Sequence, residues 1–253
     1  MSTEFPRREG SGLSRYHRYS KSSYYAVVGS LPLLLAYEVL ILSGSTAQFE
    51  VRNAADVLLR TLLGAAGLSP NQAYLAMILA LILSIPLVRN SRMELEPRYF
   101  AYMLGEAFAY SLVLGFVINL LLQPLLTAAA WPLARPWPLA LPAGSSWNQV
   151  LAQSLGAGLF EEFLFRVLLL NALLALTRLV LAEWLGVLVS ILAASFLFAL
   201  AHYLGPLGDP LRLDSFLFRW VAGLLFTVLY YARGFAVTAY AHALYDIRVL
   251  MLS

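Results

Sequence analysis

Residues 160–166 read FEEFLFR, and they place two adjacent glutamates and an arginine inside a long apolar run. Each charged side chain at the centre of a bilayer costs roughly 2.5–3.5 kcal/mol on insertion scales. Without partners, Glu161, Glu162, Arg166 and Asp246 would together cost on the order of 10–14 kcal/mol, comparable with the net stability of a typical domain. The stretch therefore predicts a bundle in which several membrane helices converge on these charges.

The composition of the whole chain is that of an integral membrane protein. Of its 253 residues, 60% are hydrophobic and only 12% are charged, and the mean hydropathy is +0.74. Cysteine is absent, which excludes disulfides, thiol nucleophiles and thiolate metal sites. The net charge of +3 comes from an arginine-rich N-terminus rather than from a basic stripe interleaved with aromatic residues, so we expect no nucleic-acid partner.

Long apolar segments recur along the chain, and a spanning helix needs about 20 mostly apolar residues. They predict an all-α fold, a polytopic transmembrane bundle of about seven to eight membrane helices. We expect one membrane domain over residues 22–253, with 149–252 as the helical core that carries these intramembrane charges. The expected spans are 24–42, 72–88, 99–122, 149–176, 184–204, 215–232 and 234–252.

Two further segments are expected at the membrane surface. Residues 51–66 carry apolar residues at helical spacing with arginine and aspartate off that stripe, which indicates an interfacial helix. An eighth, partly buried helix is the alternative. Residues 123–148 contain five prolines and three tryptophans, and this composition predicts an interfacial loop.

The distribution of basic residues predicts the orientation. Residues 1–21 hold five of them with little apolar content, which predicts a flexible, basic cytoplasmic tail. With the N-terminus inside, the inner segments carry ten basic residues and the outer segments carry four, which places the C-terminus outside. Lys21 is the only lysine, and this bias toward arginine indicates a prokaryotic cell membrane.

The spacing of the intramembrane charges offers two pairs. Glu162 and Arg166 are four residues apart on one predicted helix, and His242 and Asp246 are four apart on another. Glu161 and His202 are left to find partners on other helices. We therefore expect one hydrated cavity where the fourth, fifth and seventh spans meet, with small residues such as Gly156 and Gly158 allowing close backbone approach.

Three short motifs follow one another on successive apolar segments. FEEFLFR matches an EExxxR pattern, FALAH (residues 198–202) matches FxxxH, and HALYD (residues 242–246) matches HxxxN or HxxxD. In this order, the set resembles the CAAX protease and bacteriocin-processing (CPBP/ABI) family of intramembrane glutamic endopeptidases, related to the Ras-converting CAAX endoprotease. The resemblance covers roughly residues 150–250.

The resemblance implies a peptide-bond hydrolase in which Glu161 and His202 activate a water molecule. It implies that His242 and Asp246 face the developing oxyanion. Well-described members carry Asn at the last motif position, and an ionised aspartate cannot donate a hydrogen bond as asparagine does. We therefore expect Asp246 to hold His242 protonated, or else to be protonated itself.

The resemblance gives supporting roles to three further residues. Glu162 and Arg166 would brace the site, and Phe198 would pack beside His202. It implies a membrane-anchored protein or peptide as substrate and no cofactor, and it leaves the oligomeric state open.

Three other functions compete with this interpretation. The two histidines with Glu161 and Asp246 form a donor set for zinc, which would make a metalloprotease, although no HExxH occurs. Buried Glu, His and Arg are also typical of a relay in a proton-coupled transporter. The third alternative is an inactive membrane scaffold or immunity protein.

Overall fold

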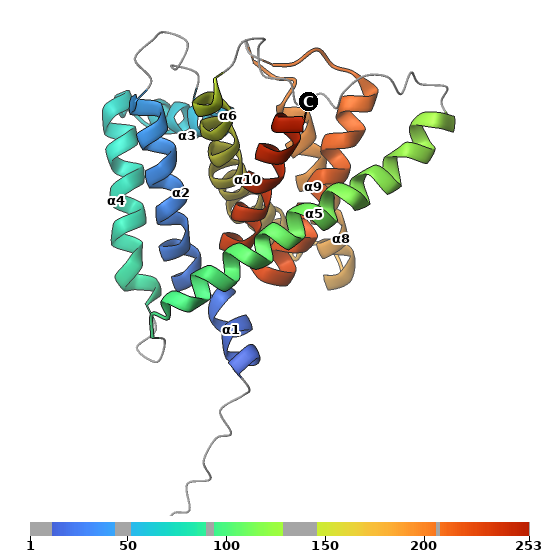
Figure 1. The fold of residues 1–253 in the computed structure, drawn as a ribbon. Helices are drawn as coiled ribbons and strands as arrows, with labels where there is room; N and C mark the ends of the chain where they lie inside the picture. Colours follow the sequence, from blue (N-terminus) through green and yellow to red (C-terminus); the bar gives the residue numbers. More distant parts are fainter. Residues whose placement is uncertain (1–11, 44–51, 90–93, 129–145, 206–207, 253) are drawn as a thin grey trace, which may run out of the picture.

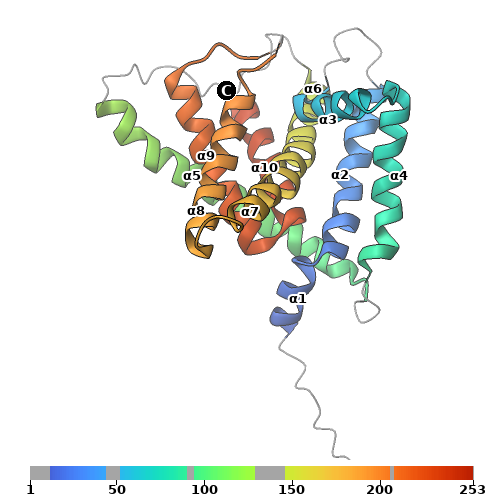
Figure 2. The same ribbon diagram turned by 180° about the vertical axis from the view of Figure 1, so that it is seen from behind.

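The computed structural model describes residues 12–43, 52–89, 94–128, 146–205 and 208–252. Within these ranges every regular element is a helix and no strand occurs, as the composition predicts. Helices α2 (Ser23–Ser43) and α4 (Pro70–Val88) stand side by side, with α3 (Ala54–Ala65) lying across their ends (Figures 1 and 2). The long helix α5 (Pro97–Ala128) crosses the other helices obliquely (Figure 1).

The C-terminal half supplies the rest of the bundle. The segment expected as one span over 149–176 is a succession of α6 (Trp147–Gly156), the π-helical segments η2 (Ala157–Glu161) and η3 (Phe163–Leu170), and α7 (Asn171–Thr177). It is followed by α8 (Glu183–Ala201), α9 (Leu213–Arg233) and α10 (Phe235–Leu252). Gly234 joins the last two with a φ of 80°, which L side chains rarely adopt.

Five described helices are long and apolar enough to cross a membrane: α2, α4, α5, α8 and α9. The sequence predicted seven spans, and all seven expected segments are helical. Interior prolines in α2, α4 and α5 do not end these helices, because a membrane helix tolerates the loss of one backbone hydrogen bond.

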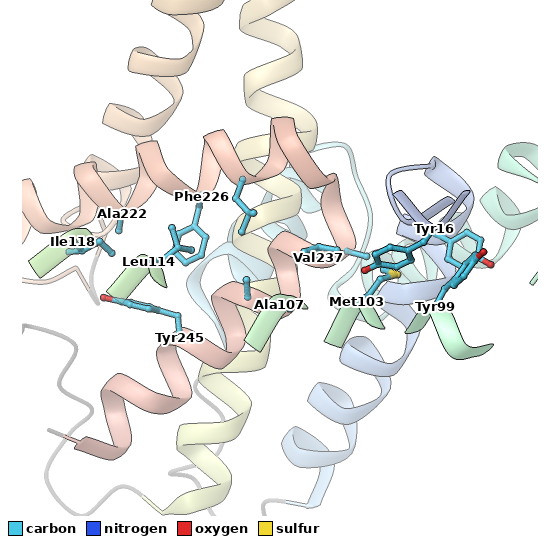
Figure 3. Close-up of a cluster of buried hydrophobic side chains, with 14 of the residues drawn as sticks. Tyr16, Tyr99, Met103, Ala107, Leu114, Ile118, Ala222, Phe226, Val237 and Tyr245 are labelled. Atoms are coloured by element: carbon cyan, nitrogen blue, oxygen red, sulfur yellow. The ribbon is translucent and has the colours of Figure 1, made fainter. Parts of the chain in front are cut away.

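The hydrophobic core lies where α5 meets α9 and α10. Figure 3 shows Leu114 and Ile118 of α5 facing Ala222 and Phe226 of α9, with Tyr245 of α10 beside them. The cluster continues to the N-terminal helix α1 (Gly12–Ser20). This packing fixes α10, which carries two of the expected site residues.

Two expectations for the polar segments were wrong in part. Residues 12–20, expected in a flexible tail, form α1, because Tyr16 and Tyr19 bury their rings against Tyr99 of α5. Residues 123–128, expected in a loop, continue α5 through Pro124, and residues 146–148 belong to the start of α6. The rest of that expected loop and residues 1–11 lie outside the described residues.

Candidate active site

The two glutamates of FEEFLFR lie at the junction of the π-helical segments. Glu161 ends η2, and Glu162 separates it from η3; their exposed fractions are 9% and 0%. Gly158 makes this burial possible, because a Cβ there would lie 2.3 Å from the carbonyl oxygen of Ala239 on α10. A π turn widens the helix and is frequent at functional sites.

Glu161 presents its two carboxylate oxygens to different partners. Its Oε1 accepts a hydrogen bond from Nδ2 of Asn53 at 3.0 Å. Its Oε2 lies 3.8 Å from Nε2 of His202, which directly follows α8. Asn53 immediately precedes α3, so the carboxylate joins the N-terminal half of the chain to the C-terminal half.

The tautomer of a neutral His202 is determined by the hydrogen bond at its Nδ1. Nδ1 lies 2.9 Å from the carbonyl oxygen of Phe198, and a carbonyl can only accept a hydrogen bond. Nδ1 therefore carries the hydrogen, and Nε2 is left as an acceptor. Two acceptors, Nε2 and the Glu161 carboxylate, thus face each other across a short gap.

Glu162 has both carboxylate oxygens engaged. Oε2 lies 3.2 Å from Nε of Arg166, as the four-residue spacing predicts, and Oε1 lies 2.7 Å from Nδ1 of His242. The buried Arg166 guanidinium also donates to the carbonyl oxygen of Gly223 and lies 4.5 Å from the centre of the Phe198 ring. Glu162 therefore ties η3 to α10.

His242 lies between two carboxylates and an aromatic ring. Its Nε2 is 3.6 Å from Oδ2 of Asp246, one helical turn further along α10. Phe226 of α9 stacks on the imidazole, with ring centres 4.4 Å apart and an interplanar angle of 21°. This packing fixes the ring plane, so Nε2 keeps one direction.

These side chains border one cavity of about 180 Å³. A single buried water needs only roughly 10–15 Å³, so water and part of a substrate fit. The expected site residues that line the cavity are Glu161, Phe198, His202, His242 and Asp246. Glu162 and Arg166 do not line the cavity but contact residues that do: Glu162 contacts His242, and Arg166 contacts Phe198.

The sequence analysis missed several contributors to the cavity. Asn53 falls inside the helix predicted over residues 51–66 and Arg219 inside the span predicted over residues 215–232, and no role was predicted for either. Arg219 is 5% exposed, pairs with Asp209 at 2.5 Å and lines the cavity with it. The Glu162–His242 contact joins residues 80 positions apart, which no local spacing indicates.

A family model matches the C-terminal part of the chain, which carries all the site residues described above except Asn53. Residues 143–248 match the model described as Rce1-like, type II CAAX prenyl endopeptidase Rce1-like. This match supports the resemblance of residues 150–250 to the CAAX protease family. No curated protein and no solved structure matches the chain.

The match over residues 143–248 and the apolar helices together support a CAAX-type protease of the membrane. The family is one of endopeptidases, which goes against the transporter interpretation. Asn53 lies outside the matched residues, so part of the site wall comes from a segment that the match does not cover. Among the described residues, no three His, Asp or Glu side chains are grouped so as to hold a metal ion.

Proposed function

We propose that this CAAX-type protease is an intramembrane glutamic endopeptidase that hydrolyses a peptide bond of a membrane-associated protein or peptide. The observation that carries the proposal is the 3.8 Å gap between Glu161 Oε2 and His202 Nε2 inside the cavity. Hydrogen bonds of roughly 2.8 Å from one water to each atom span this gap. Such a water donates one hydrogen to each acceptor, which leaves a lone pair to attack a carbonyl carbon.

Glu161 is a better candidate for the general base than its neighbour. Both oxygens of Glu162 are occupied by Arg166 and His242, whereas Glu161 Oε2 faces the cavity. In the proposed reaction, Glu161 takes a proton as the water oxygen bonds to the carbonyl carbon. The proton then passes to the leaving amine as the C–N bond breaks.

His242 is the candidate donor to the oxyanion that this attack creates. With a carboxylate near each ring nitrogen, the imidazole is favoured in its protonated form, so Nε2 donates. Glu162 and Arg166 act through position: the arginine charge holds Glu162, and Glu162 orients His242. A donor that is already fixed in the direction of the developing charge contributes strongly to transition-state stabilisation.

Asp246→Asn tests the role of the last motif residue. We expect cleavage to continue with kcat lowered about tenfold, because Glu162 still holds the ring while the asparagine removes one of its two negative partners. Steady-state kinetics on a membrane-anchored peptide measure the change. Full activity would show that Asp246 is not needed to keep His242 charged.

The absence of a cofactor is tested on purified protein in liposomes. We expect wild type to cleave a membrane-anchored peptide at the same rate before and after dialysis against a chelator, because Glu161 and His202 activate water without a metal. Metal content is measured in the same samples. Stoichiometric zinc that is lost together with activity would show that the enzyme is a metalloprotease instead.

The inactive scaffold is tested by the wild-type protein itself. If wild type cleaves no membrane peptide, either in vitro or in a comparison of cells with and without the gene, the scaffold is favoured.

A further inference from the structure

The segment that precedes α3 reaches the candidate general base from outside the matched family region. Asn53 is 5% exposed, and its Nδ2 donates to Glu161 Oε1 at 3.0 Å. The two residues are 108 positions apart in the sequence. Asn53 also lines the cavity, so its amide belongs to the wall that a substrate meets.

The orientation of the Asn53 amide is determined by its second partner. Its Oδ1 accepts a hydrogen bond from the backbone N–H of Ala55 at 2.9 Å and caps α3. A backbone N–H can only donate, so the atom facing it must be the oxygen. The nitrogen therefore points at Glu161, and a flipped amide would lose both bonds.

A buried charged network anchors the backbone of Asn53. Its N–H donates to the hydroxyl of Tyr37 at 3.2 Å, and that hydroxyl donates to Asp56 Oδ2 at 3.0 Å. Arg52 bridges Asp56 and Glu38 with contacts of 2.9 and 3.0 Å. The network fastens the first turn of α3 to α2, so the amide has little freedom to move away.

Gly156 permits the close approach of this segment to the glutamate helix. A Cβ on Gly156 would lie 2.7 Å from Cβ of Asn53 and 2.8 Å from the Tyr37 ring. A side chain there would push Asn53 outward, away from the cavity. The contact between the segment before α3 and helix α6 therefore depends on the glycine backbone at Gly156 as well as on side-chain hydrogen bonds.

We infer that Asn53 is a positioning residue for catalysis: its amide holds Glu161 Oε1 so that Oε2 alone faces His202 and the attacking water. The inference rests on the proposed role of Glu161 as general base. One carboxylate oxygen is thereby fixed and the other is left to take the proton. The same hydrogen bond favours the ionised carboxylate, which is the form that accepts a proton.

Two substitutions separate this role from the capping of α3. Serine and aspartate are both good caps, so Asn53→Ser and Asn53→Asp keep an acceptor for the Ala55 N–H. An ionised aspartate has no donor, and the serine hydroxyl is one bond too short to replace the Asn53 Nδ2 contact with Glu161. We expect Asn53→Ser to lower kcat roughly 10- to 100-fold with little change in KM, since a hydrogen bond to a charged group is lost. Asn53→Asp lowers kcat further, because it sets a second carboxylate against the first.

The pH profile distinguishes positioning from a structural role. In both variants the acidic limb of the kcat profile moves to higher pH, because a carboxylate without its donor is protonated more readily. Ser69→Ala is the matched control: it removes the exposed cap of α4, which touches no site residue, and leaves both kcat and the profile unchanged. Thermal unfolding in detergent checks that all the variants fold.

The assay uses full-length protein in liposomes and a membrane-anchored peptide that wild type cleaves. Wild-type kcat and an unshifted acidic limb in folded Asn53→Ser would overturn the positioning role and leave Glu161 as the base. Cleavage by Glu161→Gln at close to the wild-type rate would instead overturn the proposed function itself. A loss of kcat of the same size in Ser69→Ala would show that the effect does not come from the contact between Asn53 and Glu161, against the inference.

Discussion

Glu161→Gln is expected to abolish detectable peptide cleavage while leaving the protein folded. Glutamine has the same shape and keeps an oxygen for the amide of Asn53, so the contact at 3.0 Å survives. The group facing His202 becomes an amide, which cannot accept a proton from water. General-base catalysis contributes typically about 10²–10⁴-fold, and kcat should fall by that factor.

A carboxylate elsewhere on the bundle provides the matched control. Glu183 is exposed in the first turn of α8, the helix that His202 follows, so Glu183→Gln removes a charge without touching the cavity. Single-turnover cleavage of a membrane-anchored peptide in liposomes measures both variants. We expect Glu183→Gln to match wild type. Turnover by Glu161→Gln within threefold of wild type would rule out Glu161 as the base.

Local spacing was sufficient to predict part of this site. Glu162 and Arg166 share a short helical segment, so the distance of 3.2 Å between their charged atoms follows from their separation of four residues. The cost of unpaired charges in a membrane also predicted that Glu161 and His202 would find partners on other helices in one shared cavity. The catalytic roles of these residues stay predictions until activity is measured.

Other contacts depend on tertiary structure, which a single sequence does not show. Asn53 meets Glu161 only because the segment before α3 is packed against α6 at Gly156. Asparagine is a preferred N-cap residue, so the sequence could have predicted that Asn53 caps a helix. The predicted helix instead began at residue 51 and included Asn53. The π-helical turns at 157–161 and 163–170 have no pattern that distinguishes them from ordinary helix.

The predictions for residues 12–20 and 123–128 were wrong for a different reason. In α1, the tyrosines carry the packing, and a count of apolar and charged residues treats this segment as a solvated tail. In α5, Pro124 was taken as the end of the helix, whereas a proline removes only one hydrogen bond and the flanking leucines favour helix. Both errors concern segments outside the catalytic core, so the expected site was unaffected.

The largest effect on stability is expected at Arg166. Its side chain is 1% exposed and faces Glu162 at 0% exposure, so Arg166→Met leaves this buried carboxylate with the His242 imidazole as its one remaining ionic partner among the described residues. Breaking a buried pair in this way typically costs about 3–5 kcal/mol. We expect the unfolding midpoint in a denaturing detergent to fall accordingly, whereas Arg178→Met, at an exposed arginine after α7, changes little.

A double substitution separates the charge from the packing of the arginine. Glu162→Gln combined with Arg166→Met removes both members of the pair, so no uncompensated buried charge remains and much of the stability should return. Activity should not return, because His242 then lacks the carboxylate that lies 2.7 Å from its Nδ1. If the double variant is no more stable than Arg166→Met alone, the arginine stabilises the fold through its contacts with Phe198 and Gly223 rather than by balancing Glu162.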